Sequence, residues 1–299
     1  MRLGQLRDFI AIVETGSLRS AARSLGVSQP AISKSLRQLE RELRVQLLQR
    51  NARGAATTRA GKVFLARARV IQSELRRAAD DLAALSGGAQ GAVAFGMGPA
   101  SCMRLAPDAL AQFRRAHPDA NVRIIEGATD VLVARVRDEM LDFCVSQRPE
   151  GRLDAGLRFR PLYRPRLAVV GRRGHPLRNA RSLRELAGAQ WLMFYPRQGG
   201  GMLGKMFAGA GLELPAGLVH CESYATALAL VAKTDVLGLL AAESVDEPWG
   251  RQLQKIDIEP AVPAPLLGLY TLADAPLTAA ASAMAQALTA TARRLARER

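Results

Sequence analysis

Amide, hydroxyl and cationic side chains gather on the outer face of one predicted helix, between residues 29 and 37. The sequence QPAISKSLR places two apolar residues, Ile32 and Leu36, at helical spacing on the inner face. The outward-facing residues are Gln29, Ser33, Lys34 and Arg37. Amides and hydroxyls can hydrogen-bond base edges, and cations can bind phosphates. This chemistry predicts DNA binding, although an ordinary helical hairpin with a solvated polar face would carry similar residues.

A preceding helix and a tight turn are expected to position this face. Apolar residues recur at helical spacing over residues 18–25. Gly26 can end that helix in the left-handed conformation, and Val27 is expected to fill the corner. Ser28 is a favoured N-cap, and Pro30 falls in a first turn, where its missing N–H costs little. Two helices joined in this way are typical of a helix-turn-helix.

The flanking segments complete a small domain. Residues 3–14 carry an apolar face and predict a first helix that packs on the other two. Residues 44–58 predict two short strands around a turn at 51–54. This wing carries Arg50 and Arg53 near its tip, where they could contact phosphates or the minor groove. A solvated basic hairpin is the alternative.

Residues 58–86 predict one long helix that ends at two glycines. Its apolar residues alternate in steps of four and three over three heptads: Phe64, Ala68, Ile71, Leu75, Ala78, Leu82 and Leu85. Such a repeat is typical of a coiled-coil seam, although a core helix can show it too. A long helix between two domains needs a partner for its stripe. We therefore expect a homodimer that presents two recognition helices to a two-fold-related DNA site.

Positive charge is concentrated in the N-terminal segment. The chain has 299 residues and a formal net charge of +15, which favours a polyanionic partner. Residues 1–58 contain ten Arg or Lys and four Asp or Glu, whereas residues 90–299 contain 26 and 20. This asymmetry indicates a DNA-binding head on a more neutral body.

Other functional classes find little support in the sequence. It has no run of eighteen apolar residues, and Arg2 and Arg7 interrupt any signal-peptide core. Cys102, Cys144 and Cys221 lack paired metal spacing and indicate a reducing cytoplasm. Scattered histidines and the lack of a Gly-x-Ser-x-Gly motif predict no metal, no cofactor and no enzyme. A redox-active Cys102 is a weaker alternative.

From Gly91 onward, predicted strands and helices alternate. Residues 91–146 have a β-α-β-α-β order, which predicts a parallel sheet flanked by helices. A second set begins at residue 166. The arginine cluster within residues 158–173 is expected to form a solvated crossover, with binding of an acidic partner as the alternative. A last strand is predicted at 266–271, followed by a helix. Two such lobes would leave a cleft where strand ends and helix N-termini meet.

Four loops at this cleft could hold a small effector. Helix N-termini favour anions, and Arg197 could bind a carboxylate or sulfonate. The candidate contacts are Gly98, Pro99, Ser101, Thr129, Tyr195, Arg197 and Ser223. Each hydroxyl could instead serve only as a helix cap. Their convergence favours an anionic or aromatic-anionic effector.

Residues 1–86 resemble the N-terminal part of the LysR-type transcriptional regulators. The matching run is FIAIVETGSLRSAARSLGVSQPAISKSLRQLERELRVQLLQRNARGAATTRAG, and its motif spacing is similar throughout. It departs at Leu48 and Ala56, where many members have Phe and Leu, which bears on the packing of the wing. The resemblance implies that the third helix lies at the major groove. The expected DNA-binding residues are Ser17, Ser28, Gln29, Pro30, Ser33, Lys34, Arg37, Arg50 and Arg53.

The resemblance extends over essentially the whole chain. It implies a multidomain fold with an all-α winged helix-turn-helix head, a long linker helix and a two-lobed, periplasmic-binding-protein-like α/β effector domain. The expected boundaries are 1–58 for the head, 59–87 for the linker and dimerisation helix, 88–161 with 268–299 for effector subdomain I, and 162–267 for subdomain II. It also implies a homotetramer, and such a regulator could contact RNA polymerase.

The expected function is therefore a cytoplasmic, sequence-specific transcriptional regulator controlled by a small effector. One alternative is a small-molecule-binding protein whose basic head binds nucleic acid without sequence preference. An enzyme on the C-terminal fold is a weaker alternative, because fold alone does not exclude it but no catalytic motif supports it.

Overall fold

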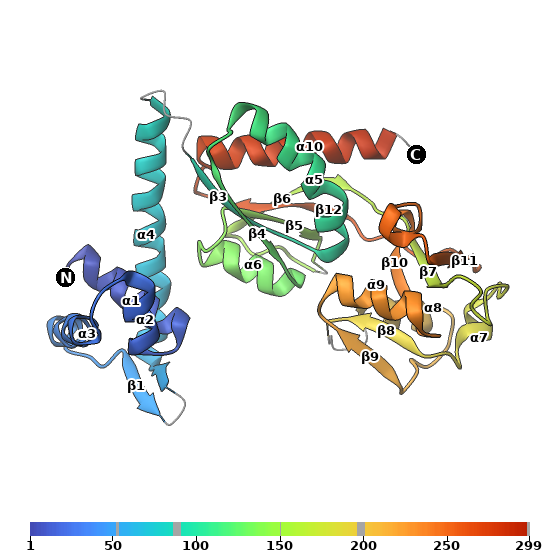
Figure 1. Cartoon of the computed structure of the whole chain (residues 1–299), viewed down its shortest axis with the longest axis horizontal. Coiled ribbons are helices and arrows are strands. Elements are labelled where there is room, and N and C mark those ends of the chain that lie inside the picture. Colours follow the sequence, from blue (N-terminus) through green and yellow to red (C-terminus); the bar gives the residue numbers. More distant parts are fainter. Residues whose placement is uncertain (52–53, 86–90, 150, 196–200, 298–299) are drawn as a thin grey trace. The chain divides into compact units, whose positions relative to one another are not determined.

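The computed structural model describes residues 1–51, 54–85, 91–149, 151–195 and 201–297 (Figure 1). The chain forms two compact units. One comprises Met1–Gly91 with Arg137–Met140, and the other comprises Ala92–Val136 with Leu141–Arg299.

Three helices build the head of the first unit: α1 (Leu3–Thr15), α2 (Leu18–Leu25) and α3 (Gln29–Leu43). They enclose a core in which Phe9, Ile32 and Leu39 are at most 1% exposed. As predicted, Gly26 ends α2 in the left-handed region, with φ 66°. The predicted helix-turn-helix is confirmed.

The turn itself differs in one detail. The Val27 side chain is 39% exposed, so the prediction that it fills the corner was wrong. Its amide instead donates to the carbonyl of Ala22 over 3.0 Å and closes the end of α2. Backbone hydrogen bonding, and not burial of this side chain, therefore fixes the turn.

The wing consists of β1 (Leu48–Asn51) and β2 (Gly54–Thr57), which pair antiparallel with Asn51 opposite Gly54. The Glu40 carboxylate ties it to α3 by accepting hydrogen bonds from the amides of Leu47 (2.8 Å) and Leu48 (3.2 Å). Leu48 also packs, half-buried, against the core of the head. The wing thus forms with Leu at this position.

Helix α4 (Arg59–Leu85) changes its surroundings along its length. Near its start, Phe64 packs edge-on against Phe9 with ring centroids 5.3 Å apart, and Ala68 is fully buried. Further along, Ile71, Leu75 and Leu82 are 36%, 47% and 67% exposed. The first part belongs to the core of the head, whereas Ile71, Leu75 and Leu82 are open to solvent in the single chain.

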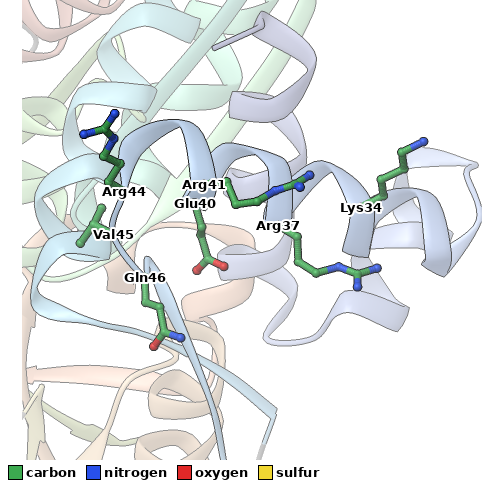
Figure 2. Close-up of a pocket in the computed structure, with 7 residues that line it drawn as sticks. All are labelled: Lys34, Arg37, Glu40, Arg41, Arg44, Val45 and Gln46. Atoms are coloured by element: carbon green, nitrogen blue, oxygen red, sulfur yellow. The ribbon is translucent and has the colours of Figure 1, made fainter.

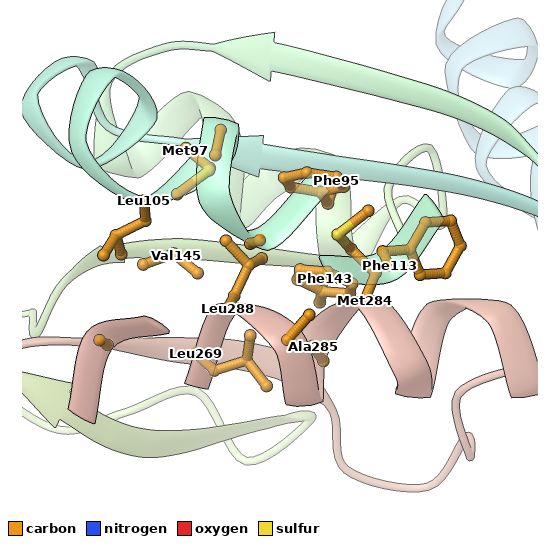
Figure 3. Packing of buried hydrophobic residues seen from close by; sticks show 14 of the residues in the cluster. Phe95, Met97, Leu105, Phe113, Phe143, Val145, Leu269, Met284, Ala285 and Leu288 are labelled. Atoms are coloured by element: carbon orange, nitrogen blue, oxygen red, sulfur yellow. The ribbon is translucent and has the colours of Figure 1, made fainter. Parts of the chain in front are cut away.

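The first lobe of the second unit is a five-stranded sheet. Its strands, in spatial order, are β4 (Asn121–Glu126), β3 (Ala92–Met97), β5 (Phe143–Gln147), β12 (Leu267–Leu272) and β6 (Leu157–Tyr163). Helices α5 (Pro99–Ala116) and α10 (Ala279–Arg297) cover one face, and α6 (Thr129–Arg137) packs on the other (Figure 1). Figure 3 shows the apolar side chains of the main core, including Phe95, Phe143 and Leu288, packed between the sheet and these two long helices.

The second lobe is another five-stranded sheet. Its strands, in spatial order, are β11 (Leu253–Ile256), β7 (Leu167–Arg172), β10 (Leu237–Ala241), β8 (Trp191–Phe194) and β9 (Leu218–Cys221). Its helices are α7 (Leu183–Leu186), α8 (Gly201–Gly209) and α9 (Tyr224–Lys233), with short 3₁₀ turns η2 (Ala242–Val245) and η3 (Pro248–Gly250). The fully buried Trp191 packs edge-on against Phe207, and its indole N–H donates to the Leu186 carbonyl.

The parallel pairing predicted for the strands within residues 91–146 is confirmed, but each complete sheet is mixed. In the first lobe, β3 is parallel to β4 and β5, but β12 is antiparallel to β5 and β6. Strand β6 lies where a solvated crossover was expected, and that expectation was wrong for Leu157–Tyr163. The arginines of this strand made its sequence resemble a solvated loop. Arg160 is exposed, but it also donates a hydrogen bond to the Thr289 hydroxyl over 2.8 Å. Among the described helices, none has the length and apolar character needed to cross a membrane.

Candidate functional site

The outer face of α3 carries most of the residues expected to bind DNA. Gln29, Pro30, Lys34 and Arg37 are exposed, and Ser33 is half-buried. Pro30 lies in the first turn, as predicted. The amide of Gln29 and the cations of Lys34 and Arg37 are therefore accessible to an external partner.

Two of the expected DNA-binding hydroxyls act on the backbone. Ser17 caps α2 by accepting from the amide of Ser20 over 3.1 Å, and Ser28 caps α3 by accepting from the amide of Ala31 over 3.3 Å. These caps fix where each helix begins and so position the outer face of α3.

The wing residues are only partly described. Arg50 lies in β1, opposite Ala55, and its backbone belongs to the antiparallel pair. Arg53 lies outside the described residues.

Sequence reasoning missed a continuation of the basic face beyond Arg37. A groove along the second half of α3 and the following loop is lined by Lys34, Arg37, Glu40, Arg41, Arg44, Val45 and Gln46 (Figure 2). Four of these residues are cations, and Lys34, Arg37, Arg41 and Arg44 follow one another in steps of three and four residues. That spacing was the signal that could have found Arg41 and Arg44, because such residues share one face of a helix.

A pocket of about 180 Å³ lies between the two lobes of the second unit. The first lobe contributes the loops that follow β3, β4 and β5, and the second contributes the ends of β8 and β10 with the start of α8. Of the expected effector residues, the pocket is lined by Gly98, Pro99, Ser101, Thr129 and Tyr195. The structure thus brings five of the seven candidates together.

The remaining two candidates have other places. The Ser223 side chain accepts from the amide of Thr226 over 3.3 Å and caps α9, while the next residue, Tyr224, lines the pocket. Arg197 lies outside the described residues. Sequence reasoning also missed Ser146 and Gln147, although both lie at the carboxyl end of a predicted parallel strand, where ligands commonly bind.

Polar groups line the pocket mainly on the side of the first lobe. The hydroxyls of Thr129 and Ser146 lie 2.8 Å apart, and the Ser101 hydroxyl lies 3.3 Å from that of Tyr163. The amides in the first turns of α5 and α6 have no carbonyl within their own helix to accept from them. This wall therefore offers hydroxyls and backbone N–H groups to a ligand.

The second lobe contributes a largely apolar wall. Its lining residues include Leu192, Met193, Phe194, Met202, Leu203, Leu239 and Leu240. Two phenols interrupt it, and burial raises the pKa of both Tyr195 and Tyr224. Both phenols are therefore neutral at physiological pH. The described lining residues include no charged side chain, but the Glu126 carboxylate adds to the raised pKa of Tyr195.

The described residues hold no group of three or more His, Cys, Asp or Glu side chains that could bind a metal ion. Of the three cysteines, Cys144 and Cys221 are buried and Cys102 is half-buried. Burial raises the pKa of the Cys102 thiol, and Glu126 raises it further. Both effects disfavour the thiolate that a reactive cysteine needs.

Two family models match the chain. The model for the bacterial regulatory helix-turn-helix protein, lysR family, matches residues 3–62, and the model for the LysR substrate binding domain matches residues 86–293. Among curated relatives, the HTH-type transcriptional regulator GbpR of Azospirillum brasilense is 31% identical over 97% of this chain and 86% of its own length. The SDS degradation transcriptional activation protein of a Pseudomonas species is 31% identical over 94% of each chain. GalR of Pseudomonas putida is also 31% identical, and that match spans 61% of its length.

Solved structures share the fold. CbnR, a LysR family transcriptional regulator, has a TM-score of 0.71 at 22% identity over 98% of this chain and 99% of its own. Full-length CbnR in complex with its target DNA has a TM-score of 0.68 over 97% of this chain and 100% of its own.

Proposed function

The chain belongs to the LysR family of transcriptional regulators, and from that premise we propose that a small anionic effector controls its binding to a specific promoter site. As a member of this family it is a DNA-binding regulator with an effector-binding domain, and not an enzyme. The effector binds in the pocket between the two lobes, and its carboxylate or similar group faces the first lobe.

One observation carries the effector assignment: the pocket has a polar wall and an apolar wall. Thr129, Ser146 and the first turn of α5 offer hydrogen-bond donors, which can hold an anion. An apolar cavity of about 150 Å³ admits one benzene ring, so a cavity of about 180 Å³ suits a ligand with one small ring or an equivalent chain. The proposed contacts are Gly98, Pro99, Ser101, Thr129, Tyr195 and Arg197, with Ser223 acting through its cap on α9.

A thermal-shift comparison tests the charge of the effector. The full chain is heated with a panel of small organic acids and with the primary amide of each acid. Binding to the folded state raises the melting temperature. We expect at least one acid to raise it and the matching amide to have less effect. Equal shifts from acids and amides would contradict the anionic assignment. The test is demanding because the Glu126 carboxylate, which acts on the pocket residue Tyr195, would repel an anion.

A pair of variants links the shift to the pocket. Thr129→Val removes a hydroxyl from the polar wall and should abolish most of the shift, because the ligand loses a hydrogen bond. Thr226→Val makes the same change at an exposed position on α9 and should leave the shift intact. Equal responses from both variants would place the ligand elsewhere.

DNA recognition is assigned to α3 and the wing. The proposed contacts are Ser17, Ser28, Gln29, Pro30, Ser33, Lys34, Arg37, Arg50 and Arg53, with the two cap residues acting through the backbone. Binding to the promoter region of the chain's own gene is compared with binding to random DNA at one salt concentration. Tighter binding to the promoter supports specific regulation, and equal affinities would contradict it.

We further propose a homodimer through residues 58–86, and a homotetramer and contact with RNA polymerase from the family resemblance. The proposed boundaries are 1–58, 59–87, 88–161 with 268–299, and 162–267. The division within the effector domain is supported by β6 and β12 lying in one sheet and β7 and β11 in the other. We propose a cytoplasmic location because a promoter is the partner.

A further inference from the structure

Four cations form a stripe along one face of α3 and its C-terminal cap. The α3 cation stripe consists of Lys34, Arg37, Arg41 and Arg44, and all four side chains are exposed (Figure 2). Steps of three, four and three residues keep them on one face, and the rise of a helix spreads them over about 15 Å. The stripe thus has twice as many cations as the pair, Lys34 and Arg37, that the sequence analysis identified.

The acidic residues of α3 do not neutralise this stripe. Glu40 accepts hydrogen bonds from the amides of Leu47 and Leu48. Glu42 pairs with the N-terminal ammonium of Met1 at 2.5 Å and accepts from the Gln38 amide at 3.1 Å. Within the described part of the chain, none of the four stripe cations forms an ion pair. Their charge is therefore available to an external partner.

Arg44 occupies a helix-end position where glycine is usually found. It is the C-cap of α3 with φ 55° and ψ 34°, in the left-handed region. Glycine is the usual residue at such a helix end, because a side chain is strained there. A cation near a helix C-terminus gains some energy from the helix dipole, and this could explain Arg41 and Arg44 alone. It does not explain why they extend the line begun by Lys34 and Arg37, nearer the other end of the helix.

We propose that the α3 cation stripe lies along the phosphate backbone of DNA, and that Arg41 and Arg44 add phosphate contacts that are independent of base sequence. This rests on the proposed DNA-binding function and extends it beyond the residues assigned above. Phosphates fit the stripe because a DNA strand presents regularly spaced negative charges, each of which a guanidinium can bind through two N–H groups. Gln29, in the first turn of α3, remains the candidate for reading bases.

Salt dependence tests the proposal on a short duplex of random sequence. Affinity of the full chain is measured by fluorescence anisotropy between about 50 and 200 mM salt. Each lost phosphate contact should reduce the slope of log affinity against log salt by about 0.9. The double variant Arg41→Gln, Arg44→Gly should therefore lower the slope by about 1.8 for each head that contacts the duplex, relative to the wild type. Arg178→Gln removes an exposed arginine from the second unit and should leave the slope unchanged.

The same samples separate a role in DNA binding from a role in the fold. Arg44→Gly alone should keep or raise the melting temperature, since glycine relieves the left-handed strain, while it lowers the slope by about 0.9 for each head that contacts the duplex. An unchanged slope in the double variant, with wild-type binding intact, would overturn the stripe proposal. A lower melting temperature for Arg44→Gly with an unchanged slope would also overturn it. Failure of the wild type to bind any duplex would instead overturn the proposed function.

Discussion

Gly61, in the first turn of α4, lies so close to Leu47 that an added Cβ would be 2.0 Å from the Leu47 carbonyl oxygen. That carbonyl cannot move freely, because it accepts a hydrogen bond from the amide of Thr58. Gly61→Ala must therefore displace α4 from the start of the wing. We expect the free energy of unfolding of the head to fall by about 1–3 kcal/mol, as overpacking usually costs. Denaturant unfolding of the full chain measures this loss.

Gly4→Ala is the matched control for that change. Gly4 lies in α1, and nothing lies within 4 Å of an added Cβ. Alanine restricts the unfolded chain more than glycine does, so this variant should be neutral or more stable by about 0.4–1 kcal/mol. Similar losses in both variants would show that the contact with Leu47 is unimportant.

Gln29→Ala tests base reading by the start of α3. A side-chain amide can bind an adenine edge through two hydrogen bonds, and losing such a pair costs about 1–3 kcal/mol. Affinity for a duplex selected by the wild type should fall about 10- to 100-fold, and affinity for a random duplex should hardly change. Gln38→Ala is the control, because its amide binds Glu42 in the same helix. Equal losses on both duplexes would remove Gln29 from base recognition.

Leu75→Asp tests the dimer proposed for α4. Leu75 is 47% exposed in the single chain and lies on the heptad stripe, so a carboxylate there would be buried in a dimer. An unpaired charge at the seam should weaken association by on the order of 3 kcal/mol or more. Sedimentation should then find monomers at concentrations where the wild type is dimeric. Val63→Asp adds the same charge at a 66% exposed position off the stripe and should leave the dimer intact.

Cysteine labelling tests the alternative of a reactive thiol. Burial raises the pKa of Cys144 to about 12 and also raises that of Cys102. A group whose pKa rises loses its proton only at higher pH. At pH 8 about a quarter of an ordinary thiol is thiolate, against about one in ten thousand for a pKa near 12. Native Cys144 should resist iodoacetamide until the chain unfolds, as followed by peptide mass spectrometry. Rapid native labelling of Cys102 would restore the redox alternative.

Local signals made the head and linker predictable from sequence. Ser28, Pro30 and Gly26 each act on their own segment of backbone, so the caps and turn follow from residue type alone. The heptad steps likewise located α4. The exposure of Val27 could not be predicted in this way. It depends on the angle at which α2 and α3 meet, and the preference of a single residue type does not determine that angle.

Pairing between distant segments made the effector domain harder to predict. Strand β6 joins the sheet only because β12, more than a hundred residues later, lies beside it. Its sequence mixes Arg158, Arg160 and Pro161 with apolar residues, which suits an edge strand but resembles a loop. Pocket residues at helix starts, such as Ser101, could be predicted. Ser146 could not be ranked above other serines until β5 was placed beside β3.

Tyr163 at the end of β6 and Leu267 at the start of β12 are antiparallel partners. The chain therefore leaves the first lobe and returns to it at a single point in its sheet. The second lobe amounts to a long insertion in the turn of a β-hairpin, and its removal need not open the sheet. Joining Tyr163 to Leu267 through a short turn should yield an independently folding one-lobe protein, the natural starting point for circular permutation or for grafting a different sensor module onto this head.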